Sequence, residues 1–305
     1  MTQTFTLASS DLTVTISPLG ARLETLRFQG GPSLLLHSDD PAWRNSYAGT
    51  IVGPVANRVK GGQVRIDGKT YQMPCNENGV TALHSGPDGL DRQTWQVITH
   101  DSAALHLRCT LTDGAGGLPG NRVFDATYRV DGPCLSLDIR ATTDAATPIS
   151  LAHHPYWRLG DASDHRLCVA AETYLPVDAR NVPTGHILPV AGTVFDHRHP
   201  RPLDPQTDHN FCIATARRSA PVRVATLHGS NGLTLRIDST EPGLQVYAGG
   251  LMPDMPDAGI KPGAGIALEP QGWPDSPNQP GFPSIIACPD TAYWQKTSYR
   301  IAIAT

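Results

Sequence analysis

One carboxylate in this sequence of 305 residues has a setting that suits a general base. Glu269 ends a short apolar run, 265–268, and leads directly into a proline-rich segment, 270–280. Because Pro270 fixes its own φ and biases the preceding residue toward an extended backbone, the direction of the Glu269 side chain is constrained. A carboxylate that is held in place and shielded from water can take a proton from a substrate. The segment alone equally allows a structural Glu269 that caps a loop or pairs with an arginine.

Four other segments carry side chains suited to holding a polar substrate. Arg58 follows Asn57 in a glycine-flanked apolar stretch, where a guanidinium presents forked donors to carboxylates or sugar hydroxyls. His84 lies in a turn bounded by glycine, and His154 ends a strand-like run just before a proline and two aromatic residues. Asp208 opens a short polar segment. Each of these residues could be structural by itself, but two histidine clusters with aromatic neighbours favour a site for a sugar.

Metal and cofactor chemistry finds little support in the motifs. Twelve histidines are present, and His197 with His199, or His153 with His154, could supply metal ligands. However, the sequence has no H-E-x-x-H motif and no Cys/His spacing typical of a metal site. It also lacks the G-x-S-x-G elbow of serine hydrolases and the glycine-rich motifs of nucleotide-binding proteins. We therefore expect neither a metal nor a cofactor.

The elements that must position these residues are strands. Apolar and polar residues alternate over 12–16, 64–67, 135–140 and 233–238, a period of two that is typical of strands with one buried face. Asp-Gly or Asn-Gly pairs at 67–68, 113–114, 131–132 and 231–232 predict turns. Long amphipathic helices are hard to find, in line with 29 glycines and 27 prolines. The sequence predicts an all-β protein, a large antiparallel β-sandwich with few short helices and long functional loops.

Composition limits the partners and the compartment. No linker divides the chain, so we expect a single domain over 1–305. The formal charge of −4 has no run of like charges, which argues against a nucleic-acid partner. No signal peptide and no apolar stretch of membrane-spanning length is recognisable, so we expect no membrane association. Six scattered cysteines indicate thiols in a reducing cytoplasm. The protein would act on a small molecule as a monomer or homodimer.

Taken in order, several short motifs resemble those of the aldose 1-epimerase (galactose mutarotase) family. They lie at 53–62, 83–91, 116–121, 154–159, 178–185, 192–196, 208–211 and 268–271. Each motif is short, but their fixed order is specific and covers the chain from about residue 10 to 300.

The resemblance implies a galactose mutarotase-like supersandwich with the sugar in an open cleft on one sheet. It implies that Glu269 is the base and His154 the acid of an anomer interconversion that needs no cofactor. The resemblance also implies that Arg58, His84 and Asp208 contact the substrate, together with Asn57. Trp157 or Trp273 could stack on the sugar ring, although both suit the core equally well.

Two residues depart from the family pattern. Ser85 stands where the family usually has glycine, which suits the position only if its φ is not positive. His153 stands where Asn or Thr is usual, and a second imidazole could lower the pKa of His154 by charge repulsion.

The sequence leaves two alternatives open. One is a carbohydrate-binding β-sandwich without turnover, which would not need an acid and a base. The other is a sugar-phosphate epimerase of the same fold, which would use extra cations from a set that the sequence offers: Arg158, Arg180, Arg198 and Arg201.

Overall fold

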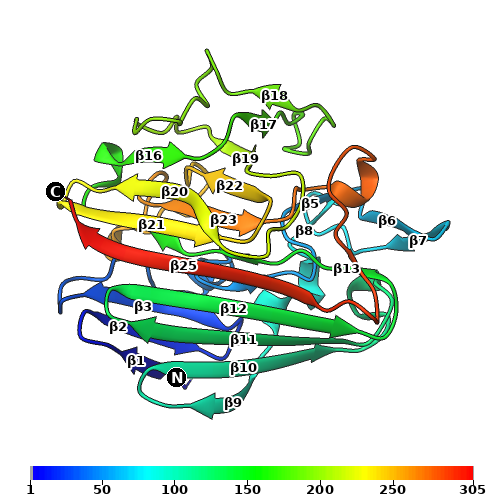
Figure 1. Ribbon diagram of the computed structural model, residues 1–305, viewed down its shortest axis with the longest axis horizontal. Coiled ribbons are helices and arrows are strands. Elements are labelled where there is room, and N and C mark those ends of the chain that lie inside the picture. The colour runs from blue at the N-terminus through cyan, green and yellow to red at the C-terminus, as the bar shows by residue number, and fades with distance from the viewer. Residues whose placement is uncertain (1–2, 305) are drawn as a thin grey trace.

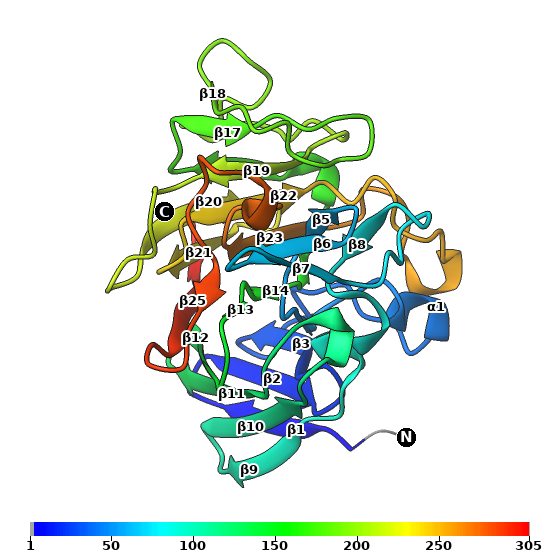
Figure 2. The ribbon, with the colours of Figure 1, turned by 90° about the vertical axis from the view of Figure 1, so that its right-hand side faces the viewer.

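The computed structural model describes residues 3–304 as two layers of antiparallel sheet. Figure 1 shows an eight-stranded sheet in front, with a three-stranded sheet behind its lower part and a six-stranded sheet behind its upper part. Figure 2 shows the same layers from the side, with β5 (Arg58–Lys60) to β8 (Thr81–Leu83) and α1 (Pro41–Arg44) on the side of the second layer that faces away from the eight-stranded sheet. The sequence-based prediction of a large antiparallel β-sandwich is confirmed.

Each of the three larger sheets is built from strands that pair with their spatial neighbours. In spatial order, the eight-stranded sheet contains β16 (Arg166–Val169), β20 (Val222–His228), β21 (Leu233–Ser239), β25 (Tyr293–Ile303), β12 (Cys134–Thr143), β11 (Arg122–Asp131), β10 (Ala104–Leu111) and β9 (Gln96–His100). The six-stranded sheet contains β15 (Tyr156–Trp157), β23 (Ile266–Gln271), β22 (Gly243–Tyr247), β19 (Asp208–Cys212), β17 (Thr173–Leu175) and β18 (Leu188–Pro189). The three-stranded sheet contains β1 (Phe5–Ala8), β2 (Leu12–Ser17) and β3 (Arg22–Phe28).

The remaining elements are short. Two-stranded pairs are formed by β13 (Thr147–Pro148) with β24 (Ile286–Ala287), β14 (Ala152–His153) with β4 (Ile51–Val52), β5 (Arg58–Lys60) with β8 (Thr81–Leu83), and β6 (Gln63–Ile66) with β7 (Lys69–Gln72). The helices are α1 (Pro41–Arg44) and the 3₁₀ turns η1 (Gly86–Asp88), η2 (Leu90–Arg92), η3 (Ala115–Gly117), η4 (Ala162–Asp164), η5 (Pro256–Ala258) and η6 (Ser276–Asn278). This agrees with the prediction of few short helices.

Three of the four alternating segments, 12–16, 135–140 and 233–238, form strands of the layers, while 64–67 falls in β6 of a two-stranded pair. Their apolar residues are mostly buried. Leu135, Leu137 and Ile139 of β12 are buried in the main core, and Val14 of β2 and Val246 of β22 reach the same core from the second layer. All four turn dipeptides lie between strands that pair with each other. The one at 113–114 lies in a longer loop, between β10 and β11, that contains η3.

The six-stranded sheet has a core face and an outer face, and the outer face carries the polar residues of interest. In β22, Leu244 and Val246 belong to the main core, so Gln245 and Tyr247 point to the other side. In β23, Leu268 belongs to the core and Glu269 therefore faces outward. The register pairs Gln245 with Glu269, which places their side chains next to each other on the outer face.

One expectation about Glu269 needs correction. Its strand does not end there, because β23 continues through Pro270 to Gln271 and all six residues of the strand are buried. A proline is tolerated because β15 pairs with β23 only at Ile266 and Ala267, which leaves Pro270 with a strand neighbour on one side only. Glu269 is therefore positioned by a sheet rather than by a loop.

Candidate active site

A cavity of about 230 Å³ lies on the outer face of the six-stranded sheet. All six residues that the sequence predicted for the site line this cavity: Asn57, Arg58, His84, His154, Asp208 and Glu269. Side chains that the sequence analysis did not single out complete the walls, chiefly Glu77, Tyr47, Tyr156, Gln245 and Tyr247. The cavity therefore brings together segments that are far apart in the chain, from Ser46 to Glu269.

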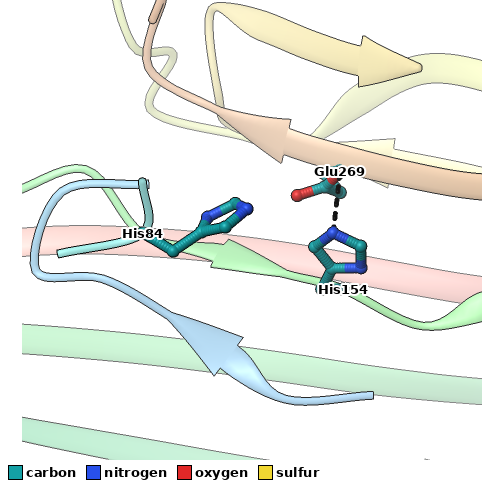
Figure 3. Close-up of side chains that lie close together, drawn as sticks. All are labelled: His84, His154 and Glu269. Carbon is teal, nitrogen blue, oxygen red and sulfur yellow. Dashed lines mark ion pairs between the residues drawn. The ribbon is translucent and has the colours of Figure 1, made fainter. Parts of the chain in front are cut away.

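Glu269 and His154 form a buried acid–base pair. Oε1 of Glu269 lies 3.5 Å from Nε2 of His154, and Figure 3 shows the two side chains facing each other, Glu269 from β23 and His154 from the segment just after β14. The two residues are 2% and 5% exposed. The backbone of His154 is held on both sides, since its N–H donates to Thr50 and its carbonyl accepts from Gly49. Oε2 of Glu269 and Nδ1 of His154 are buried without a hydrogen-bond partner among residues 3–304. A substrate hydroxyl could satisfy such atoms.

Burial shifts the two pKa values in opposite directions. Burial first, and the Asp208 carboxylate second, raise the pKa of Glu269 well above its ordinary value, which makes its carboxylate a stronger base. Burial lowers the pKa of His154 to about 4, which makes its imidazolium a stronger acid. Between these two pKa values the pair holds one proton in total, and both shifts favour the uncharged form with that proton on Glu269. The form with a free Glu269 carboxylate and a protonated His154 is the less populated one, and it is the form in which Glu269 is a base and His154 an acid.

His84 is held as a hydrogen-bond donor. Its Nδ1 accepts a hydrogen bond of 3.1 Å from the backbone N–H of Asn57, so a neutral His84 carries its proton on Nε2. Burial, followed by the charges of His154 and Arg58, lowers the pKa of His84 well below its ordinary value and favours this neutral form. Asn57 also accepts the N–H of Arg58 through its side chain, at 2.8 Å. Asn57 thus lines the cavity and positions two of its neighbours.

The hydrogen bond from the Asn57 N–H to His84 Nδ1 disfavours metal binding by His84. His84, His154 and Glu269 have possible ligand atoms within 4.8 Å of one another, and they converge in Figure 3. A histidine that binds a metal through Nε2 needs a proton on Nδ1 and an acceptor beside it. The Nδ1 of His84 instead faces a donor, the Asn57 N–H. The geometry suits a group that donates to a sugar oxygen better than it suits a metal ligand.

Arg58 is clamped between two carboxylates. Its Nε and Nη2 donate to Glu77 at 2.9 Å, and its Nη1 donates to Asp208 at 3.2 Å. Gln245 donates to the other oxygen of Asp208 at 2.6 Å. Thr81 donates to Glu77 as well, which completes a network that fixes the guanidinium. Glu77 has no recognisable sequence signal, because it lies in an irregular segment between β7 and β8.

The aromatic walls are tyrosines, and of the two roles left open for Trp157 and Trp273 the structure shows the core. Tyr47 packs against His84 with a centroid distance of 4.6 Å, and Tyr156 packs against His154 at 5.1 Å. Trp157 is fully buried in the main core, and Trp273 is 3% exposed and packs against Phe282. Strand alternation explains the difference in β15, since Tyr156 and Trp157 are consecutive and must face opposite sides.

Comparison with known proteins gives a consistent result. The family model described as aldose 1-epimerase matches residues 3–300. The galactose mutarotase of Mus musculus is 36% identical over 283 residues, which cover 86% of this chain and 80% of the mouse protein. The aldose 1-epimerase of Escherichia coli K12 is 32% identical over 277 residues, 84% of this chain and 80% of the bacterial protein. The chain belongs to the aldose 1-epimerase family.

Solved structures agree with the family assignment. An aldose epimerase homologue from C. elegans superposes with a TM-score of 0.91 at 28% identity over 100% of both chains. Galactose 1-epimerase from Lactobacillus acidophilus superposes with a TM-score of 0.87 at 27% identity, covering 98% of this chain and 94% of the other.

Ser85, the first departure from the family pattern, does occupy a left-handed conformation. Its φ is +68°, in a run of positive φ values that includes His84 and Gly86. The expectation that serine fits only if φ is not positive is therefore wrong. The side chain offsets the strain, because Ser85 Oγ accepts the N–H of Val55 at 2.8 Å and donates to its carbonyl at 3.2 Å. His84 is thereby fixed in place without the usual glycine.

We expect Ser85→Ala to destabilise the protein more than Ser85→Gly does. Alanine keeps the left-handed strain and leaves the Val55 N–H unpaired, which should cost about 1–3 kcal/mol of unfolding free energy. Glycine loses the same hydrogen bonds but removes the strain, so it should be more stable than alanine by about 1 kcal/mol. Urea unfolding of the three proteins measures both differences. Equal stability of the two variants would show that the backbone at Ser85 is not strained.

His153, the second departure, faces away from the cavity into the core. Its Nδ1 lies 3.0 Å from the hydroxyl of Tyr299 and its Nε2 lies 3.3 Å from that of Tyr128. Burial lowers the pKa of His153 to about 3, so it carries no charge at neutral pH. The expected charge repulsion of His154 by His153 is therefore absent, and burial is what lowers the pKa of His154.

Proposed function

We propose that the protein is an aldose 1-epimerase, which interconverts the α- and β-anomers of a free aldose by opening and closing the sugar ring. In this proposal Glu269 is the general base and His154 the general acid, while Arg58, Asp208, His84 and Asn57 hold the sugar. The family membership and the relatives named galactose mutarotase and aldose 1-epimerase support this activity.

Opening the sugar ring needs two proton transfers and cleavage of the C1–O5 bond. Closing the ring reverses these steps. Glu269 takes the proton of the C1 hydroxyl, the C1–O1 bond becomes a carbonyl, and the C1–O5 bond breaks with its electron pair on O5. His154 gives its proton to O5. After rotation about C1–C2, His154 takes the proton back from O5 and O5 attacks the other face of C1. Glu269 then returns its proton to O1, which completes the opposite anomer.

The spacing of the acid and the base carries the proposal. O1 and O5 are bonded to the same carbon, so a base for one and an acid for the other must lie close together. The 3.5 Å between Glu269 and His154 meets this requirement, and each of the two side chains has a further buried polar atom without a partner in the described part of the chain. The Arg58 clamp would position the ring so that its C1 and O5 face this pair. A protein that only binds sugar has no need of such a pair.

A sugar-phosphate substrate is not favoured. None of Arg158, Arg180, Arg198 and Arg201 lines the cavity. Arg58, which does, is already engaged by two carboxylates. Polarimetry of freshly dissolved α-D-galactose and α-D-glucose tests the proposed activity directly. The optical rotation should reach equilibrium faster than in buffer alone, and an unchanged rate for every free aldose tested would refute the proposal.

The pH dependence of kcat/KM should be a broad bell. As the pH falls through about 4, His154 and Glu269 both become protonated, and activity is lost because no base remains. As the pH rises through the raised pKa of Glu269, the pair loses its single proton, and activity is lost because no acid remains. Initial rates across this range, corrected for spontaneous mutarotation, measure both limbs. A single limb near the ordinary pKa of histidine would contradict this assignment.

The compartment and the assembly are part of the proposal. All six cysteines are free, which suits a reducing cytoplasm. Within residues 3–304, the helices are too short or too polar to cross a bilayer. We propose that the chain works as a single domain, either as a monomer or as a homodimer.

A further inference from the structure

A hollow of about 650 Å³ lies between the segment that follows β15 and the segment that leads into β23. Its walls come from residues within 158–165, 203–205 and 259–266, together with Ala248. None of its wall residues lines the active-site cavity. A packed apolar cluster lies between the two spaces, because it contains Met252 from the cavity wall and Ala264 from the hollow wall. The hollow is therefore a space of its own.

Two cations in the wall of this hollow have no carboxylate bound to them. Arg158 and Lys261 are exposed at the hollow, and neither forms an ion pair within residues 3–304. Nε and Nη1 of Arg158 reach only the carbonyls of Gly160 and Gly259, at 3.4 and 3.5 Å. These contacts are longer than ordinary hydrogen bonds, so the guanidinium can still bind an anion that enters the hollow.

His165 adds a buried donor to the same wall. Its Nε2 accepts the N–H of Leu159 at 3.0 Å, so the neutral ring carries its proton on Nδ1. Burial is the main cause that lowers the pKa of His165, and it favours this neutral form. His165 is 2% exposed, and its Nδ1 has no hydrogen-bond partner in the described part of the chain. Because an unpaired buried N–H costs free energy, an acceptor oxygen in the hollow would stabilise it.

One carboxylate, that of Asp161, also lines the hollow. Its Oδ1 accepts from the backbone N–H and the hydroxyl of Ser163, at 3.0 and 2.9 Å. The hydrogen bonds from Ser163 first, and the charges of Lys261 and Arg158 after them, lower the pKa of Asp161, so it is charged at neutral pH. Two cations and one anion leave the wall with a net positive charge. A carboxylate accepts hydroxyl protons, so this wall suits a ligand that carries both an anionic group and hydroxyls.

We propose that this hollow binds the phosphate monoester of a small polyhydroxy compound. A phosphate has three terminal oxygens and nearly two negative charges, which match Arg158, Lys261 and the Nδ1–H of His165. In this proposal the hydroxyls of the ligand face Asp161, and its carbon atoms pack against apolar walls such as Ile266. The site lies outside the proposed mutarotation, because it shares no wall with the cavity that holds the acid–base pair.

Calorimetric titration with glycerol 3-phosphate tests the site, with sodium chloride of the same ionic strength as the reference. The wild-type protein should bind glycerol 3-phosphate and should not bind glycerol. Replacing both cations, by Arg158→Gln together with Lys261→Gln, should weaken binding by about tenfold or more. Arg140→Gln together with Arg300→Gln is the charge-matched control, on exposed positions of β12 and β25 in the other layer. It should change the affinity by less than about twofold, and an equal loss in both double variants would overturn the site.

A second variant blocks the hollow without changing its charge. Ser163 is exposed at the hollow, so Ser163→Trp should weaken binding by about tenfold or more as well. Gln96→Trp, on exposed β9, is its control and should leave the affinity unchanged. No binding to the wild-type protein, or an unaltered affinity in Ser163→Trp, would overturn the site.

Two competing ligands define what the site recognises. Inorganic phosphate should bind more weakly than glycerol 3-phosphate, because it has no carbon-bound hydroxyls for Asp161. Equal affinities would overturn the proposed class of ligand. Galactose should not displace glycerol 3-phosphate, and displacement would move the phosphate to the active-site cavity and overturn a separate site. These titrations do not depend on mutarotation, so their failure and the failure of the proposed function are distinguishable.

Discussion

Replacing Glu269 with glutamine should abolish mutarotation while leaving sugar binding measurable. Glutamine has nearly the same shape but cannot accept the C1 hydroxyl proton, and losing a general base costs roughly 10²–10⁴ in rate. Arg58 and Asp208, which line the cavity and which we propose hold the sugar hydroxyls, are unchanged, so the dissociation constant for the sugar should change little. Polarimetry gives the rate and calorimetric titration gives the affinity. An unaltered rate in the variant would remove Glu269 from the mechanism.

Stability provides an internal control for the Glu269→Gln experiment. Burial raises the pKa of Glu269 in the folded state, so its contribution to stability is fully present below the unfolded pKa and is lost as the pH rises through the folded pKa. A neutral amide has no such loss, so the unfolding free energy of the variant at neutral pH should not fall.

Glu241 offers a matched comparison. It is fully buried and paired with Arg217 at 2.7 Å, outside the cavity. Glu241→Gln weakens this buried ion pair, so it should lower stability while the folded protein keeps its kcat. Loss of kcat in both variants would indicate that any buried glutamate matters for the fold and would weaken the case for Glu269 as the base.

His154→Gln should lower kcat by roughly a hundredfold or more, because no acid then protonates the ring oxygen. The acid limb of the pH profile near pH 4 should disappear with it, since that limb belongs to His154. If His154 had only a structural role, His154→Gln would lower the amount of folded protein. The activity that remains would then still fall near pH 4. Initial rates from pH 3 to 7 distinguish the two results.

His84→Gln is the comparison for His154→Gln. To act as the acid, His84 would need a proton on both ring nitrogens, and this would break its hydrogen bond from the Asn57 N–H. We therefore expect His84→Gln to raise KM more than it lowers kcat. Full activity in His154→Gln together with a large fall of kcat in His84→Gln would transfer the acid role to His84.

The alternating strands of the layers were predictable because each of them buries mainly one face. In β12 and β21 the period of two follows from side chains that alternate between the core and the outside. The ordered motifs also identified Glu269, His154, Arg58, His84, Asp208 and Asn57, and all six line one cavity. β23 was harder to interpret, because all of its residues are buried and no alternation marks where it ends.

The sequence by itself determined the β-sandwich, the family and the residue types available for chemistry. Only the tertiary structure decided which side of a strand each of those residues occupies. Tyr156 faces the cavity and Trp157 the core, and His154 meets Glu269 while His153 meets two tyrosines. The reason is that side-chain direction depends on register and sheet pairing between segments far apart in the chain. Glu269 thus became a candidate base through its sequence motif, but its raised pKa comes from burial and from Asp208.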